Sequence, residues 1–217
     1  MIEKPAASPR TIWGGFLLFF SLVAVAFAVW LMQATRLQPL RVLGNVADFT
    51  LTNQADQVVT LANLTNHVWV ADIIFTRCAG PCPRMTAQMR SLQDKLPADS
   101  DAKLVTLTTD PDFDSPKVMA RYAERFGADT NRWMFLTGSK AQIAGLAGDS
   151  LKLSTDPIKP EQRKNNADLF IHATIFVIVD KHAQLRGFYE TGGDGVNWTN
   201  SVQPKLLQAV HQLENEP

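Results

Sequence analysis

The sequence predicts an α/β sandwich built on one mixed β-sheet and preceded by a single transmembrane helix. Three observations lead to this prediction. Short apolar runs with strand character alternate with segments whose apolar residues recur at helical spacing, an order typical of parallel strands joined by helices. Two strand-like runs near the C-terminus flank a short turn and add an antiparallel edge. Finally, an apolar run near the N-terminus contains no charged residue.

The N-terminal apolar run extends from Ile12 to Met32. As a helix that rises ~1.5 Å per residue it would be about 32 Å long, which matches a hydrocarbon layer of ~30 Å. A cleaved signal peptide has a shorter apolar core of ~7–15 residues and a small-x-small cleavage site, which the chain does not match well here. We therefore expect residues 1–40 to hold an uncleaved anchor, at about residues 12–32, and a linker, and residues 41–217 to form one domain.

The charges beside the apolar run do not fix its orientation. Two basic residues lie on each side of it, Lys4 and Arg10 before and Arg36 and Arg41 after. The excess of positive charge that marks a cytoplasmic flank is therefore missing. A mitochondrial presequence would be rich in Arg and Ser and poor in acidic residues, and this N-terminus does not fit that description. A bacterial inner membrane is the simpler expectation.

The overall charge argues against one class of partner. The chain has 21 basic and 21 acidic side chains, which cancel. A net positive charge that would attract a polyanion is absent, so we expect no nucleic-acid partner. The part of the chain after the anchor is long enough for a single domain with a substantial core.

The first half of the domain shows strand, turn and helix signals in turn. Phe49–Thr52 alternates like a strand, and turn-forming residues separate it from a hairpin partner at Val58–Leu61. Val68–Phe75 is largely apolar and short enough for a buried central strand. A helix is expected from about Pro83, because apolar residues follow at helical spacing. These residues are Met85, Met89, Leu92 and Leu96.

The same alternation continues after this helix. Lys103–Thr108 predicts the next strand, and the turn-rich segment Asp110–Pro116 leads into a helix that should end at Gly127. The aspartates and Ser115 of this segment are expected to cap that helix, since short polar side chains satisfy the unpaired amides of a first turn.

The last part of the domain contains the predicted antiparallel edge. Trp133–Leu136 predicts a short strand and Lys140–Ala147 a helix, while Ser154–Asn166 is polar, holds two prolines and is expected to be a loop. Thr174–Val179 and Leu185–Tyr189 flank a turn and should form a hairpin. The final helix is amphipathic, with Leu206, Leu207, Val210 and Leu213 on one face.

The two cysteines of the chain are the main chemical signal. Cys78 and Cys82 lie between a predicted buried strand and a predicted helix. The unpaired amides of a helix N-terminus, with Arg77 and Arg84 adjacent, are expected to favour the thiolate form. If the intervening turn is helix-like, residues four apart project onto one face, and the two sulfurs could bind one metal ion or form one disulfide.

The sequence leaves several interpretations of this pair open. A structural disulfide, or two ordinary buried thiols, would need no further residue. Structural zinc takes four Cys or His ligands, and the chain has no second cysteine pair. Copper fits better, because two thiolates with one imidazole form a soft environment that suits Cu(I) and can also hold Cu(II).

A copper site would need a histidine, and the chain has four. His67, His182 and His211 are expected at the surface. His172 instead begins a strongly apolar strand, where a histidine is more often a satisfied core or strand-end residue than a metal ligand. Two methionines of the helix after the cysteines, Met85 and Met89, could offer sulfur to copper, but their helical spacing is more typical of core residues.

Three segments resemble the signatures of the Sco/SenC family. The run Phe75-Thr-Arg-Cys-Ala-Gly-Pro-Cys-Pro83 is similar to F-T-x-C-x-x-x-C-P. Thr109–Pro116 resembles the D-P-x-x-D-[ST]-P segment, and His172 begins a strand that ends at Asp180, like the H-[SA]-x(6)-D segment. The resemblance covers residues from about Phe49 to Tyr189.

This resemblance implies a thioredoxin-like, three-layer fold facing the periplasm, with Cys78, Cys82 and His172 as copper ligands and the cysteines as the redox pair. It also implies delivery of copper to the dinuclear site of cytochrome c oxidase subunit II, or reduction of that site's cysteines. The partners would be that subunit or another copper enzyme, and other copper chaperones or thioredoxin-like reductases. Such a protein is a metallochaperone, with thiol–disulfide oxidoreductase activity left open.

The chain departs from the family pattern at two positions. Ala79 stands where many relatives have Pro, and Ile171 precedes the histidine where Asp is common, which puts the tuning of the imidazole in doubt.

A reductase of the cell envelope without a copper role would need the cysteine pair but not His172, although C-x-x-C is more usual there. A peroxidase is the third hypothesis.

Asp110 and Asp114 could orient the cysteine loop or contact a partner, but capping and turn roles are the simpler expectation.

Overall fold

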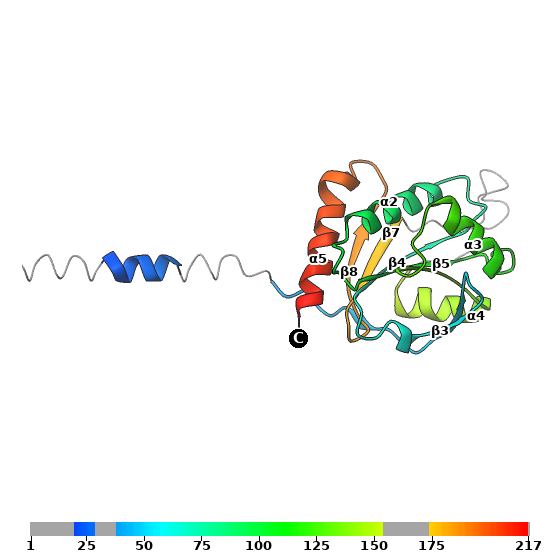
Figure 1. Cartoon of the computed structure of the whole chain (residues 1–217), viewed down its shortest axis with the longest axis horizontal. Helices are drawn as coiled ribbons and strands as arrows, with labels where there is room; N and C mark the ends of the chain where they lie inside the picture. The colour runs from blue at the N-terminus through cyan, green and yellow to red at the C-terminus, as the bar shows by residue number, and fades with distance from the viewer. Residues whose placement is uncertain (1–19, 29–37, 154–173, 217) are drawn as a thin grey trace, which may run out of the picture. The chain divides into compact units, whose positions relative to one another are not determined.

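The structure is a computed structural model that describes residues 20–28, 38–153 and 174–216 (Figure 1). The chain divides into two compact units, Met1–Pro39 and Leu40–Pro217. In the first unit, residues 20–28 are helical. Among the described residues, no helix is both long enough and apolar enough to span a bilayer. The rest of the predicted anchor and the predicted loop Ser154–Asn166 lie outside the described residues.

The described strands of the second unit form one eight-stranded mixed sheet in the order β1-β8-β7-β4-β5-β6-β2-β3. Its bounds are β1 Gly44–Asn45, β2 Thr50–Asn53, β3 Val58–Thr60, β4 Trp69–Ile74, β5 Lys103–Thr108, β6 Trp133–Thr137, β7 Ile175–Val179 and β8 Gln184–Glu190. The pairs β4·β5 and β5·β6 are parallel, whereas the other neighbours are antiparallel. The mixed sheet predicted from the sequence is therefore confirmed.

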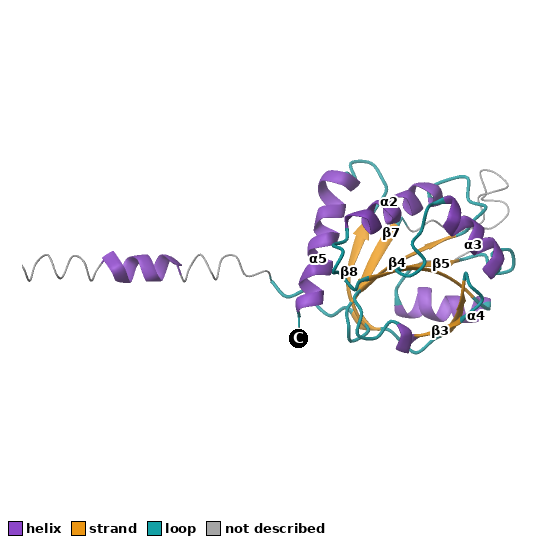
Figure 2. Ribbon diagram, viewed as in Figure 1, coloured by secondary structure: helices purple, strands orange, loops and turns teal. Residues whose placement is uncertain are grey.

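Helices cover both faces of this sheet and make three layers (Figure 2). The helices α2 (Cys82–Lys95), α3 (Pro116–Arg125) and α5 (Gln203–Asn215) pack on one face, where their buried residues join those of β4 and β7. The other face is covered by α4 (Lys140–Ile143) with the π-helical η2 (Ala144–Ser150). Shorter helical segments are η1 (Leu61–Asn63) and η4 (Trp198–Val202).

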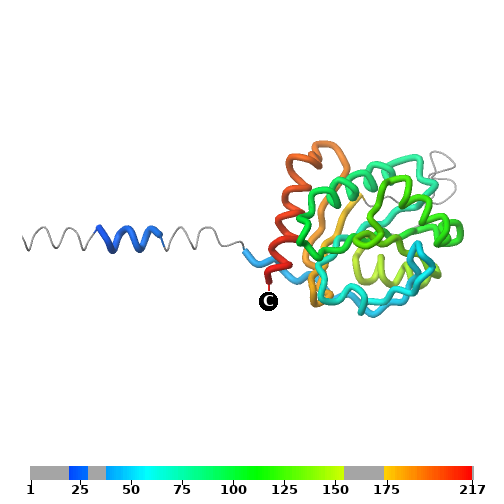
Figure 3. The backbone as a smooth tube through the Cα atoms, viewed as in Figure 1, coloured from blue at the N-terminus to red at the C-terminus, as the bar shows by residue number. Residues whose placement is uncertain are grey.

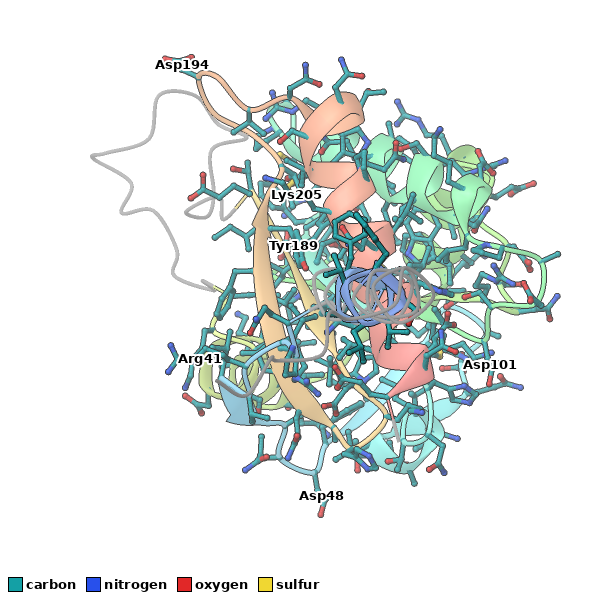
Figure 4. All side chains as sticks on the ribbon, turned by 90° about the vertical axis from the view of Figure 1, so that its left-hand side faces the viewer. Arg41, Asp48, Asp101, Tyr189, Asp194 and Lys205 are labelled. Atoms are coloured by element: carbon teal, nitrogen blue, oxygen red, sulfur yellow. The ribbon has the colours of Figure 1, made fainter. Side chains whose placement is uncertain are left out.

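The buried strand β4 is the centre of this arrangement. All six of its residues are buried, as expected for a strand covered on both faces. Because side chains alternate along a strand, Val70 and Ile74 join the core beneath α2, whereas Trp69 and Ile73 join the core on the other side. At the outer end of the sheet, Tyr189 of β8 packs against the first of these cores (Figure 4).

The predicted elements and the observed ones agree closely, with three differences. The two-residue strand β1, which pairs with β8, was not predicted. The helix predicted at Lys140–Ala147 continues to Ser150 with π-helical geometry. Ser115 is the N-cap residue of α3 but makes no side-chain capping hydrogen bond. The predicted cap was therefore wrong.

One buried guanidinium joins the two ends of the domain. Arg186 lies on β8, and its side chain is 8% exposed. It donates to Asp180 Oδ2 at 2.5 Å, to Glu216 Oε2 at 2.8 Å and to the Leu40 carbonyl oxygen at 2.6 Å. Figure 3 shows the first residues of the domain beside the end of α5, which these hydrogen bonds connect.

Candidate metal centre

The two cysteines lie where β4 gives way to α2. The Cys78 amide donates to the Phe75 carbonyl oxygen at 3.1 Å, which turns the chain sharply at the end of the strand. The Gly80 amide then donates to Cys78 Sγ at 3.3 Å. Cys82 is the first residue of α2. Both residues are free thiols and both are buried, with Cys78 7% exposed and Cys82 2% exposed.

The two side chains interact with one another, as one metal ion or one disulfide would require. Hydrogen bonding to Cys78, together with burial, raises the pKa of the Cys82 thiol well above its ordinary value, and a backbone hydrogen bond from Phe75 opposes this only in part. The expectation that both cysteines favour the thiolate was therefore wrong for Cys82. The physical reasons are the burial of Cys82 and its hydrogen bond with Cys78, and Arg77 forms an ion pair with Asp110.

The loop before α3 holds the cysteine loop in place through two aspartates. Asp114 is fully buried and accepts hydrogen bonds from the Thr76 amide at 3.1 Å and the Thr108 hydroxyl at 2.5 Å, and also from the Thr76 hydroxyl. Asp110 pairs with Arg77 at 2.5 Å, and the Arg77 guanidinium lies 4.1 Å from the centre of the Phe113 ring. These aspartates orient the cysteine loop, which the sequence suggested only as the weaker alternative to capping.

Replacing Asp114 by alanine should weaken the protein and loosen the cysteine loop. Three donors would lose a buried acceptor, and each unpaired buried group costs about 1–3 kcal/mol. We expect a loss of about 3 kcal/mol in the free energy of unfolding and faster hydrogen exchange at the amides of Thr76 and Cys78. Asp112→Ala is the matched control, because Asp112 pairs with Lys140 at the surface. Equal protection of these amides in both variants would contradict the role of Asp114.

A third carboxyl group lies beneath the cysteines and was missed by the sequence reasoning. Asp72 is on β4, on the face that carries Val70 and Ile74, and is fully buried. Its Oδ1 accepts from the Thr106 hydroxyl at 2.7 Å, and the Trp133 indole donates to that same hydroxyl at 2.9 Å. Burial raises the pKa of Asp72 to about 7. The sequence feature that could have identified Asp72 is its position as the one acidic residue in the otherwise apolar run 68–75.

The predicted third ligand, His172, lies outside the described residues. Thr174 is the first residue described after it, and its carbonyl oxygen accepts from the Thr191 amide at 2.7 Å. The Thr191 carbonyl oxygen in turn accepts from Gln88 of α2 at 2.9 Å. The chain therefore resumes after His172 at a point that hydrogen bonds connect to α2, the helix that begins at Cys82.

The remaining candidate ligands differ in their surroundings, and the two methionines belong to the same core as the cysteines. His67 pairs with Asp101 at 2.7 Å, and His211 is exposed on α5. Met85 and Met89 are buried in the core beneath α2, as their spacing predicted. Within the described ranges, no group of three or more Cys, His, Asp or Glu residues could hold a metal ion. Among the described residues, the candidate donors that interact with one another are the sulfurs of Cys78 and Cys82. Their contact fits a soft metal ion that both could bind.

Comparison with known sequences gives one consistent result. A protein-family model described as SCO1/SenC matches residues 42–205. The SCO1 protein homolog of Bacillus subtilis is 38% identical over 174 residues, which are 79% of this chain and 76% of that protein. The range of the family model includes the cysteine loop and the segment that contains Asp110 and Asp114.

Solved structures share the fold. BsSco, a member of the Sco family of cytochrome c oxidase assembly proteins with a disulfide switch, has a TM-score of 0.67 at 30% identity, covering 83% of this chain and 100% of that one. Arabidopsis thaliana ScoI with copper bound has a TM-score of 0.62 at 20% identity, covering 78% of this chain and 99% of that one. At 20% identity the second likeness shows the fold alone. The α/β fold predicted from the resemblance is confirmed by these comparisons.

Proposed function

Because this chain belongs to the SCO1/SenC family, we propose that it is a copper-binding protein that serves the dinuclear copper site of cytochrome c oxidase subunit II. It would deliver copper to that site or reduce the site's cysteines. The observation that carries the proposal is the pair of buried free thiols that contact one another at the end of β4. The fold that this chain shares with copper-bound Arabidopsis ScoI is compatible with it.

The proposed ligands are Cys78, Cys82 and His172. Two thiolates and one imidazole form a donor set that suits Cu(I) and can also hold Cu(II). Copper is cargo here, so the site has to bind the ion and release it. Asp114 contributes by fixing Thr76 and Asp110 by fixing Arg77, the two residues that directly precede Cys78. The backbone that leads into Cys78 is therefore held by two side-chain contacts.

A copper titration tests this proposal directly. The reduced full-length protein in detergent is titrated with Cu(I) and with Cu(II), and the same is done with His172→Ala, Cys82→Ser and His211→Ala. We expect Cys82→Ser to abolish tight binding of Cu(I), and His172→Ala to weaken Cu(II) binding by about 100-fold, or about 3 kcal/mol. The matched control is His211→Ala, since His211 is exposed on α5. Unchanged affinity in His172→Ala would remove His172 from the site.

The second candidate function is thiol–disulfide exchange without copper delivery. The disulfide switch of BsSco favours it, as does the mutual contact of two free thiols in this chain. The two functions separate in the same set of variants. A protein whose cysteines reduce a partner's disulfide, but whose copper affinity is weak and independent of His172, would be a reductase.

We also infer that the chain is anchored in a bacterial inner membrane by a single span at about residues 12–32, with the domain on the periplasmic side. The length of the uncharged run supports this placement, as does its match to the ~30 Å hydrocarbon layer. The client subunit would then face the same compartment as the domain. Release of the full-length chain from membranes by an alkaline carbonate wash would refute the anchor.

A further inference from the structure

Phe113 is a large apolar side chain on the surface beside the cysteine loop. It is 43% exposed, and the guanidinium that lies against its ring belongs to Arg77, the residue directly before Cys78. The other large apolar residues of the second unit that are exposed, within the described ranges, are Val42, Leu43, Val58 and Phe188. These four belong to β3, to β8 and to the segment before β1, whereas the cysteine loop follows the central strand β4.

Hydrogen bonds fix the turn that carries Phe113. The amides of Phe113 and Asp114 both donate to the Asp110 carbonyl oxygen, at 3.1 and 2.9 Å. The two carboxylates of this turn bind the cysteine loop, because Asp114 accepts from the Thr76 amide and Asp110 pairs with Arg77. An aromatic ring on a fixed turn loses little conformational entropy when a partner covers it. The ring is therefore positioned in advance for contact with another molecule.

The charged groups around the ring are paired with one another. Arg77 pairs with Asp110, and Asp112, the residue before Phe113, pairs with Lys140. Paired charges of this kind create no strong field of one sign. An apolar centre with a polar rim is the usual anatomy of a protein–protein interface, and aromatic and arginine side chains are the residues that most often dominate its binding energy.

The chemistry of the cysteines requires a partner to contact this surface. Cys78 and Cys82 are buried, and a bond between a thiolate and a metal ion is only ~2.3 Å long. An acceptor sulfur has to come equally close before an ion can change ligands or a disulfide can be exchanged. The exposed residues next to Cys78 are Arg77, Ala79 and Gly80. A partner that covers Arg77 also meets the ring on which this guanidinium lies.

We propose that Phe113, with the Arg77 guanidinium against its ring, is the anchor by which the copper-site domain of the client subunit docks on this protein. The inference rests on the proposed function, because that function names cytochrome c oxidase subunit II as the client. It adds the surface of contact, which is the turn Asp110–Ser115 together with the exposed part of the cysteine loop.

The test follows the formation of a disulfide between the two proteins. The full-length protein in detergent carries Cys82→Ser, so that Cys78 is its one cysteine. The probe is the soluble copper-site domain of a bacterial subunit II, with one site cysteine replaced by serine and the other joined to thionitrobenzoate. The Cys78 thiolate attacks the sulfur of the domain, a disulfide joins the two proteins, and thionitrobenzoate leaves as a coloured thiolate. The rate against domain concentration gives a half-saturating concentration and a limiting rate.

Removal of the ring should weaken docking and leave the reaction of the docked proteins unchanged. In Phe113→Ala the half-saturating concentration should rise by about 30-fold, or about 2 kcal/mol, as for a residue that dominates an interface. The limiting rate should stay the same, because both reacting sulfurs are retained. Phe113→Tyr keeps the ring and should stay within about two-fold of the parent.

The matched control is Phe188→Ala. Phe188 is also a phenylalanine and is 45% exposed, but it pairs with Val177, whose side chain belongs to the core on the other face of the sheet. Its replacement should leave the half-saturating concentration unchanged. Equal half-saturating concentrations in Phe113→Ala and Phe188→Ala would overturn the docking surface.

A small disulfide separates docking from a change in the cysteine loop itself. Free 5,5′-dithiobis(2-nitrobenzoate) reacts with Cys78 without a protein interface, and Phe113→Ala should react with it at the parent rate. A reaction slowed as much as that with the domain would mean that Phe113 acts only by positioning Arg77, and would overturn the proposal.

Failure of the proposed function has a different signature in the same experiment. If the parent shows no saturation with the domain, subunit II is not the client, and the docking surface is refuted with it. If the parent saturates and Phe113→Ala behaves like the parent, the docking surface alone is refuted and the client stands.

Discussion

Replacing Arg186 by alanine is expected to lower the free energy of unfolding by about 3–5 kcal/mol, the usual cost of breaking a buried ion pair from one side. The variant leaves the Asp180 carboxylate, whose side chain is 3% exposed, without its cation. It also removes the donors to the Leu40 carbonyl oxygen and to Glu216. The penalty is large because the Asp180 side chain is 3% exposed, which leaves little room for water to replace the guanidinium.

The matched control for this prediction is Arg77→Ala. Arg77 pairs with Asp110 at the same 2.5 Å separation of nitrogen and oxygen, but its side chain is 47% exposed. The Asp110 side chain is 11% exposed, so solvent reaches this pair from the Arg77 side, and the pair should contribute about 1 kcal/mol. Both variants are compared by urea denaturation, with the slope of the transition checked for constancy. If Arg186→Ala loses no more free energy of unfolding than Arg77→Ala, then burial of the Arg186–Asp180 pair does not increase its contribution to stability.

The second large effect is a dependence of stability on pH that a single group produces. The pKa of Asp72 is raised from 3.8 to about 7 in the folded protein. Between these values only the folded state keeps the proton, so the contribution of Asp72 to stability is complete below about pH 4 and is lost as the pH rises to about 7. A shift of this size corresponds to about 4 kcal/mol, because each pKa unit is worth about 1.4 kcal/mol.

Asp72→Asn removes the titrating group and keeps the side-chain shape. The difference in unfolding free energy between the parent and this variant should therefore change by about 4 kcal/mol in favour of the variant between pH 4 and pH 7, and should stay constant above that range. Urea denaturation at a series of pH values measures it. A difference that is flat between pH 4 and pH 7 would mean that Asp72 titrates normally in the folded protein.

The sequence was sufficient for most of the fold because local signals and tertiary structure agree there. The run Val68–Phe75 is apolar because β4 is buried on both faces, and the methionine spacing of α2 marks its buried side. The two-residue strand β1 was missed because it is defined only by its pairing with β8. The π-helical end of η2 was missed because its apolar residues also fit an ordinary helix.

The site was predictable only as far as the cysteines. Their position between β4 and α2 follows from the sequence order, but the partners of Asp114 do not, because Thr76 lies 38 positions away along the chain. In the turn-rich segment Asp110–Pro116, the sequence does not distinguish an aspartate that caps the next helix from one that binds the cysteine loop. The thiolate expectation failed for a similar reason, because only the fold shows that Cys82 is buried and hydrogen-bonded with Cys78.

The contacts of Arg186 have a consequence for the topology of the domain. One nitrogen, Nη2, reaches both the Leu40 carbonyl oxygen, at 2.6 Å, and the Glu216 carboxylate, at 2.8 Å. The start and the end of the fold are therefore neighbours, and a linker of a few residues, at ~3.3 Å each, could join them. A circularly permuted chain, opened in an exposed loop, could keep every strand and helix in place. Such a chain could begin and end elsewhere, because Arg186 already holds the present first and last residues of the fold together.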